Sequence, residues 1–128
     1  MKYFFTLFLI CAVSACKKSS DPIAQLKSSL TANSSRAWKL KKIFINGTEQ
    51  SLTSGQLLYN KTYDMDGSWR DTDGYSGKYE FVSTTLMRET TTVGGSYSTD
   101  FKINSLKDNV LDIEYSFNQQ TYRFVYAP

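Results

Sequence analysis

Residues 110–126 read VLDIEYSFNQQTYRFVY, two runs of alternating apolar and polar side chains separated by a short polar segment. The apolar side chains of each run share one face of an extended chain: Leu111, Ile113, Tyr115 and Phe117 in the first, and Tyr122, Phe124 and Tyr126 in the second. A two-residue period is that of a half-buried β-strand, and the polar residues 118–120 are typical of a turn. The stretch therefore predicts a β-hairpin with one buried face.

The same two-residue period extends back to residue 37, with many β-branched and aromatic residues and frequent turn signals. We expect eight strands, at 37–45, 56–65, 68–72, 75–82, 84–93, 97–106, 110–117 and 121–126. Asn46-Gly47 predicts a hairpin turn after the first strand, with a longer loop through Gly55 as the alternative. Strands joined in order by short turns predict an all-β fold, an antiparallel up-and-down barrel without exposed edges. A sandwich is the alternative, and it usually needs longer crossover connections.

The acidic stretch DMDGSWRDTDG, residues 64–74, is close to a helix-loop-helix calcium motif. However, the motif places Thr62 at its first ligand position and Asp73 at its last, where a bidentate Glu is expected. The flanking residues also keep a two-residue period rather than a helical one. Two hairpin turns, at Asp66-Gly67 and Asp73-Gly74, explain the stretch better than a calcium loop.

The N-terminus has the pattern of a secretory signal peptide: Lys2, then a short apolar run, then small residues. The run ends as V-S-A-C, residues 13–16, which resembles a bacterial lipobox and predicts cleavage after residue 15 with lipid attached to Cys16. The lipid would anchor the chain to a membrane. An ordinary signal peptide with an incidental cysteine is the alternative. The remaining cysteine, Cys11, lies within the predicted signal peptide.

Residues 16–35 are expected to form a polar tether that contains one short amphipathic helix. Asp21 can cap this helix and Pro22 suits its first turn, while Ile23, Leu26 and Leu30 recur at helical spacing. The barrel domain is then expected to occupy residues 36–128. Removal of residues 1–15 leaves about 110 residues, a length that suits one domain.

Function in such a barrel is expected in its lumen, which eight strands leave just wide enough to be filled by side chains or to hold one small ligand. The predicted lining is mainly aromatic: Trp38, Phe44, Tyr59, Tyr63, Trp69, Tyr79, Phe81, Phe101, Tyr115, Phe117, Tyr122 and Phe124. These rings either fill the core or orient an apolar ligand through their polar groups. Arg88, in phase with Leu86, would bind a ligand carboxylate inside the barrel, whereas the opposite register points Met87 inward and exposes Arg88.

The residue content argues against several classes of function. The chain has no histidine, which removes the usual general bases, most catalytic zinc sites and the Ser-His-Asp arrangement. No glycine-rich phosphate loop is present, and 15 basic against 12 acidic residues are scattered without long blocks. We therefore expect no enzyme activity, no cofactor, no metal and no nucleic-acid partner.

The chain resembles the lipocalin-like lipoproteins of Bacteroidota through its lipobox, its short helix and three stretches: RAWKLKKIFING, DGSW followed by SGKYEF, and a terminal YRFVYAP. Lipocalins carry Gly-x-Trp at the first strand, and here Trp38 is present with Arg36 in place of the glycine. The resemblance implies a lipocalin-like barrel in which Arg123 either packs over Trp38 or points to solvent.

Two functions follow from this interpretation. The first is a lipid-anchored envelope lipoprotein that binds a small hydrophobic ligand. The second is a structural module with a filled barrel that contacts an envelope protein or a glycan. Because Lys17-Lys18-Ser19-Ser20 follows the lipidated cysteine, the resemblance implies an outer-membrane anchor that faces the periplasm.

Overall fold

The computed structural model of the protein describes residues 21–128. In chain order the elements are α1 (Pro22–Thr31), β1 (Ser35–Ile45), β2 (Thr48–Gln50), α2 (Ser54–Leu57), β3 (Asn60–Asp64), β4 (Ser68–Asp71), β5 (Ser76–Ser83), β6 (Leu86–Val93), β7 (Tyr97–Lys107), β8 (Val110–Phe117) and β9 (Gln120–Ala127). The predicted signal peptide and Cys16 lie outside the described residues. Among residues 21–128, no helix has the length and apolar character needed to cross a bilayer.

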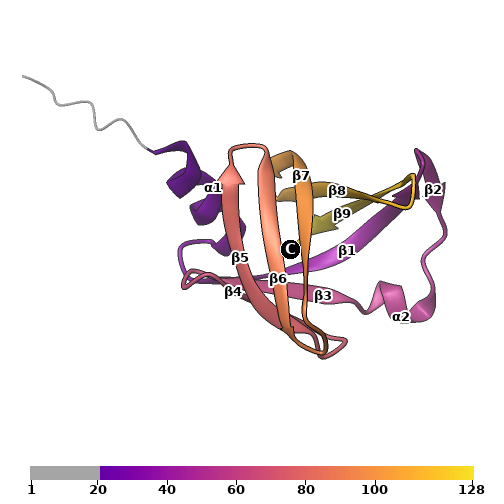
Figure 1. The fold of residues 1–128 in the computed structure, drawn as a ribbon, viewed down its shortest axis with the longest axis horizontal. Helices are drawn as coiled ribbons and strands as arrows, with labels where there is room; N and C mark the ends of the chain where they lie inside the picture. The colour runs from indigo at the N-terminus through magenta and orange to yellow at the C-terminus, as the bar shows by residue number, and fades with distance from the viewer. Residues whose placement is uncertain (1–20) are drawn as a thin grey trace, which may run out of the picture.

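The strands form one closed antiparallel barrel (Figure 1). Each strand from β3 to β8 pairs with the next, β1 pairs with β3, and β1 also pairs with β9, which closes the ring. The closed ring contains eight strands, and β2 is an additional strand that pairs with the last three residues of β1. The prediction of an eight-stranded up-and-down barrel with a short N-terminal helix is confirmed.

The acidic stretch at 64–74 forms turns on either side of β4, as predicted. Gly67 and Gly74 have φ angles of +93° and +91°, which glycine adopts without a steric penalty. The Asp66 side chain accepts a hydrogen bond from the Ser68 amide at 2.9 Å, and Asp71 accepts one from the Asp73 amide at 3.0 Å. Local bonds of this kind are why aspartate is frequent in turns. The interpretation of the stretch as two hairpin turns is confirmed.

Helix α1 covers one end of the barrel, and α2 and β2 lie at the other (Figure 1). The Asp21 side chain caps α1 by accepting the Ile23 amide at 3.0 Å, and Pro22 occupies the first turn. Leu30 is fully buried, and its carbonyl accepts the Trp38 indole N–H at 2.8 Å. The helix is thereby attached to the barrel by both packing and a buried hydrogen bond.

Arg36, not Arg123, lies over Trp38. The Arg36 guanidinium carbon is 4.8 Å from the indole centroid, and the same side chain donates to the Ser29 carbonyl of α1 at 3.2 Å. Arg123 instead lies over Phe44 at 4.7 Å and pairs with Asp112 at 2.6 Å. Of the two alternatives for Arg123, the structure agrees with the outward one: its side chain is 41% exposed, and Arg36 takes the place over Trp38.

Phe44 was predicted to line the lumen but does not, and a β-bulge in β1 explains why. The pairing of β1 with β9 shifts between Leu40 and Lys42, so the inward positions change from Trp38 and Leu40 to Ile43. One extra residue in a strand reverses the faces of all residues after it. Phe44 consequently lies on the outer face beneath Arg123.

The predicted strand at 56–65 is shorter than expected. Its first residues form the end of α2, a single helical turn with a capping box in which Thr53 accepts the Gln56 amide and the Gln56 side chain accepts the Thr53 amide. The strand itself, β3, begins at Asn60.

The buried contact of α1 with the barrel predicts a large effect of truncating Leu30. We expect Leu30→Ala to lower the free energy of unfolding by about 2–5 kcal/mol, because the substitution leaves a cavity between α1 and the barrel. Leu57→Ala is the matched control, since Leu57 is exposed, and it should change stability by less than about 0.5 kcal/mol. Urea unfolding at equilibrium measures both. Equal effects would show that α1 does not cover the barrel in solution.

Candidate functional site

The two ends of the barrel differ. We call the end beneath α1 the closed end and the opposite one the open end. The turns at the open end are 46–47, 72–75, 94–96 and 118–119. The closed half of the lumen is filled by the largest fully buried side chains: Leu30, Trp38, Tyr63, Met87, Leu111 and Ile113.

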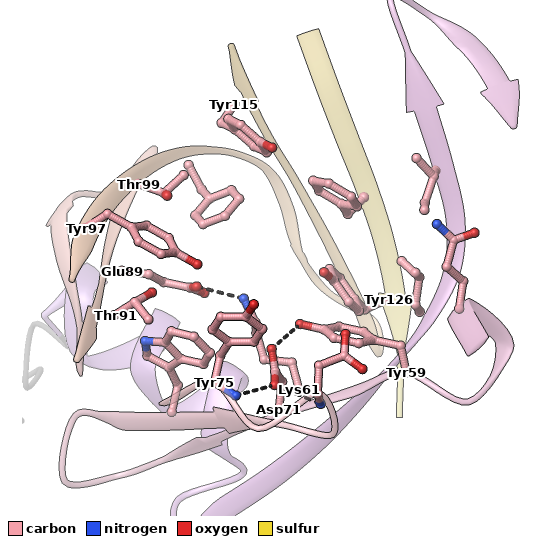
Figure 2. A pocket seen from close by; sticks show the side chains of 17 residues that line it. Tyr59, Lys61, Asp71, Tyr75, Glu89, Thr91, Tyr97, Thr99, Tyr115 and Tyr126 are labelled. Carbon is pink, nitrogen blue, oxygen red and sulfur yellow. Dashed lines mark hydrogen bonds and ion pairs between the residues drawn. The ribbon is translucent and has the colours of Figure 1, made fainter. Parts of the chain in front are cut away.

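The open half contains a cavity of about 470 Å³ (Figure 2). Its wall consists of Leu40, Ile43, Gln56, Tyr59, Lys61, Trp69, Asp71, Asp73, Tyr75, Glu89, Thr91, Tyr97, Thr99, Phe101, Tyr115, Phe124 and Tyr126. Every barrel strand except β5 contributes to it, and the labelled side chains of β3, β4, β6, β7, β8 and β9 converge on one space. The lumen therefore combines a filled half and a hollow half.

A buried ion pair forms part of the cavity wall. The Lys61 ammonium donates to Glu89 Oε2 at 2.7 Å, and the two side chains are only 8% and 4% exposed. The other oxygen, Glu89 Oε1, accepts a hydrogen bond from the Tyr63 hydroxyl. Both carboxylate oxygens are thus bonded, as a buried charge requires.

Aromatic rings also surround the Lys61 ammonium. Its nitrogen lies 4.5 Å from the centroid of Trp69 and 5.6 Å from that of Phe101. The negative faces of such rings attract a cation, and the attraction is strongest where water is excluded. The cavity wall therefore already holds one ammonium group between a carboxylate and aromatic rings.

A second carboxylate, Asp71, lies at the end of β4, closer to the open end. Its Oδ2 accepts the Tyr59 hydroxyl at 2.9 Å, and its Oδ1 accepts the amides of Asp73 at 3.0 Å and Tyr75 at 2.9 Å. These bonds hold the carboxylate in one orientation. Figure 2 shows Asp71 and Tyr59 joined beside Tyr126 in the wall.

Two tyrosines of the wall, Tyr59 and Tyr126, have pKa values raised above the ordinary value of a phenol. Burial raises the pKa of Tyr59, and Tyr126 and Asp71 raise it further. Burial also raises the pKa of Tyr126, to which Glu89 and Asp71 add. Negative charge near a phenol disfavours the phenolate, so these shifts reflect the carboxylates of the cavity as well as desolvation.

One buried donor in the wall has no acceptor. Trp69 is 4% exposed, and its indole N–H makes no hydrogen bond to any residue of the range 21–128. Buried polar groups are nearly always bonded, so this donor is an exception, and its nitrogen has almost no surface accessible from the cavity.

The structure places five of the predicted lumen residues in the cavity wall and four in the filled region beside it. Those in the wall are Tyr59, Trp69, Phe101, Tyr115 and Phe124. Those that fill the core are Trp38, Tyr63, Tyr79 and Phe81. Tyr122 stacks on Tyr115, with the ring centroids 5.2 Å apart, and Phe117 is 62% exposed beyond the barrel rim.

Arg88 is not in the lumen. Met87 is fully buried and Glu89 is nearly so, hence Arg88 points outward from β6. There it forms a two-point ion pair with Asp100, at 2.7 and 3.0 Å. Of the two registers that the sequence allows, β6 adopts the one that exposes Arg88.

The charged and polar residues of the wall were not predicted. Lys61 lies in phase between Tyr59 and Tyr63, and Glu89 lies in phase with Met87, so alternation alone places both inside. Because charged side chains are normally exposed, these two residues were not predicted to lie inside. Among residues 21–128, no group of three His, Cys, Asp or Glu side chains is arranged to hold a metal ion.

Comparison of the chain with family models, with curated proteins and with solved structures found no match. The site is therefore interpreted from its own geometry.

The Lys61–Glu89 pair predicts a large cost for neutralising one partner. We expect Glu89→Gln to lower the free energy of unfolding by about 3–5 kcal/mol, because a buried ammonium then lacks its counter-ion. Lys102–Glu114 is a matched pair on the outer surface, with Lys102 66% exposed, so Glu114→Gln should cost about 0–1 kcal/mol. Urea unfolding at pH 7 measures both. Similar losses in the two variants would contradict a buried pair.

The raised tyrosine pKa values predict a loss of stability in alkali. The phenol of Tyr126 has an ordinary pKa of 10.0, which is the value for the unfolded chain, and a higher one when folded. The contribution of the Tyr126 phenol to the free energy of unfolding is therefore complete below pH 10. Above pH 10 the unfolded chain ionises more readily than the folded one, so stability falls by up to about 1.4 kcal/mol per pH unit until the pH reaches the folded pKa. Urea unfolding between pH 9 and 12 should give a shallower decline for Tyr126→Phe than for the wild type. Parallel declines would refute the assignment.

Proposed function

We propose that the protein is a lipid-anchored envelope lipoprotein whose barrel binds a small molecule in the cavity of its open half. The observation that carries the proposal is the cavity itself. Its volume of about 470 Å³ lies within the range of ligand sites, about 300–1,000 Å³. Its wall combines aromatic surface with a few oriented polar groups, which is the usual composition of such sites.

The polar groups of the wall support a bound molecule rather than a core that is merely incomplete. A packing defect would leave apolar surface, whereas this wall presents several tyrosine side chains and the oriented carboxylate of Asp71. An occupant with polar groups of its own can bond to them.

A purely structural barrel is the alternative function, and a filled lumen would support it. The lumen is filled only at the closed end. Exposed apolar side chains surround the open end: Leu57, Leu58, Tyr75, Val93, Tyr97 and Phe117. Apolar surface beside a cavity suits the entry of a ligand with an apolar body. We therefore favour a ligand over a structural role for the barrel.

The anchor and its location rest on the sequence. The V-S-A-C stretch supports lipidation of Cys16, and Lys17-Lys18 supports an outer-membrane anchor that faces the periplasm. Because α1 begins a few residues after Cys16 and covers the closed end, this lipid would tether the barrel by the end opposite to the cavity. The resemblance to lipocalin-like lipoproteins of Bacteroidota supports the same function.

Filling the cavity tests the proposal. Thr99 lies in the cavity wall, and its neighbour Ser98 lies on the outer face, bonded to Thr90 at 3.1 Å. We expect Thr99→Trp to weaken binding of the neutral fluorescent probe N-phenyl-1-naphthylamine by about tenfold or more, because an indole occupies much of the space that the probe needs. Ser98→Trp should leave its affinity unchanged.

Fluorescence titration measures the affinity, and thermal unfolding of each variant confirms that it is folded. Equal affinities of the two variants would show that the probe binds elsewhere. A wild type that does not bind the probe would also count against the cavity as a binding site for apolar molecules.

A further inference from the structure

The charges of the cavity wall are unbalanced. The wall contains one basic side chain, Lys61, and three carboxylates, Asp71, Asp73 and Glu89. The Lys61 ammonium is bound to Glu89 at 2.7 Å, so this pair is neutral as a unit. The remaining charge of the wall is negative and belongs to the two aspartates.

The charge of Lys61 is already compensated within the protein. Its ammonium is held between Glu89 and the faces of Trp69 and Phe101, and its side chain is 8% exposed. An acid entering the cavity would therefore find no free cation and would face the carboxylates of Asp71 and Asp73. The wall disfavours fatty acids and other anionic ligands.

Asp71 has the properties of a counter-ion for a ligand. Within the described part of the chain it forms no ion pair, although Tyr59 and two backbone amides fix its orientation. Each carboxylate oxygen has two lone pairs. The two amides occupy those of Oδ1, whereas Oδ2 accepts only the Tyr59 hydroxyl and retains capacity for a further donor. A cation here would gain an oriented carboxylate at no cost in reorganisation.

Aromatic rings line the cavity beside Asp71 and beyond it. Tyr59, Tyr75 and Tyr126 lie on the side of the cavity where Asp71 lies, whereas Tyr97 and Tyr115 line it farther from Asp71, from β7 and β8 (Figure 2). Rings that surround a cation bind it through their negative faces, and this arrangement recognises alkylated ammonium groups. The pKa of Tyr126 is raised by burial and by Glu89 and Asp71, in agreement with a negative potential.

We infer that the cavity binds a small organic cation, an amine or alkylated ammonium on an apolar body, with Asp71 as its counter-ion. The inference rests on the proposed function and names the chemical class of the ligand. The ammonium lies at Asp71, near the open end, and the apolar body extends inward along Phe101 and Phe124.

Three probes with one carbon skeleton test the charge preference: 4-phenylbutylamine, 4-phenylbutan-1-ol and 4-phenylbutyrate. Calorimetric titration of the purified full chain at pH 7 should give an affinity for the amine that is about tenfold or more above that for the alcohol, since ion pairing and cation–π contacts act only on the amine. The butyrate should bind most weakly. The preference for the amine should also decrease with added salt.

Asp71→Asn tests the residue. Asparagine keeps an oxygen that accepts the amides of Asp73 and Tyr75, so the turn is retained while the charge is removed. We expect this variant to bind the amine about as weakly as the alcohol and to bind the alcohol unchanged. Asp108→Asn removes the same charge at the closed end, where the positive φ of 53° suits asparagine, and should leave all three affinities unaltered.

The outcomes separate the two proposals. Equal binding of amine and alcohol by the wild type, or tighter binding of the butyrate, overturns the cation preference while leaving the cavity as a binding site. Equal loss of amine affinity in both variants overturns the role of Asp71. Binding of none of the three probes overturns the inference, and the affinity for N-phenyl-1-naphthylamine then decides separately whether the cavity binds ligands.

Discussion

The pairing of β1 with β9 is the constraint on which the rest of the structure depends. These strands are the first and last of the ring, and their ladder, which runs from Lys39 with Ala127 to Ile45 with Tyr122, removes the two edges that an open sheet would expose. Closure also fixes the width of the lumen, because eight strands leave room for side chains or one small ligand. The sizes of the inward side chains then decide which part of the lumen is filled.

The lumen is filled at one end of the barrel and hollow at the other. At the closed end the inward positions hold large side chains, among them Trp38, Tyr63 and Met87, and α1 adds Leu30. Toward the open end, β6 and β7 place Thr91 and Thr99 inward, which are too small to reach across the ring. The cavity lies where these two inward positions hold small residues. Because α1 supplies apolar contacts at one end only, the other end stays open.

The sequence predicted the architecture because the two-residue period is strong and the turns are short. It also predicted the cap of α1, since Asp21 and Pro22 act locally. It missed β2, whose three residues are all exposed and therefore have no periodic signal, and the bulge that turns Phe44 outward. Neither has a local signature, because a bulge is set by how β1 pairs with β9. The candidate site was predicted in its aromatic part. Lys61 and Glu89 were missed because burial of a charge depends on a partner distant in sequence. Asp71 was missed because an aspartate beside a turn is explained by the turn alone.

How deeply each charged side chain of the cavity wall is buried explains which of these side chains form an ion pair within the protein. Removing an ion from water costs several kcal/mol, so a deep charge is tolerated only with a partner that satisfies it. Lys61 and Glu89 are both less than a tenth exposed and are bonded to each other, as this cost requires. Asp71 is only partly buried at the end of β4, where water lowers the cost of an unpaired carboxylate. A ligand that brings its own cation to Asp71 gives up little hydration there, while its apolar body reaches the deeper wall, where the protein has already neutralised its own charges. The order of the groups along the cavity therefore favours an amphipathic cation over either a neutral hydrocarbon or an acid.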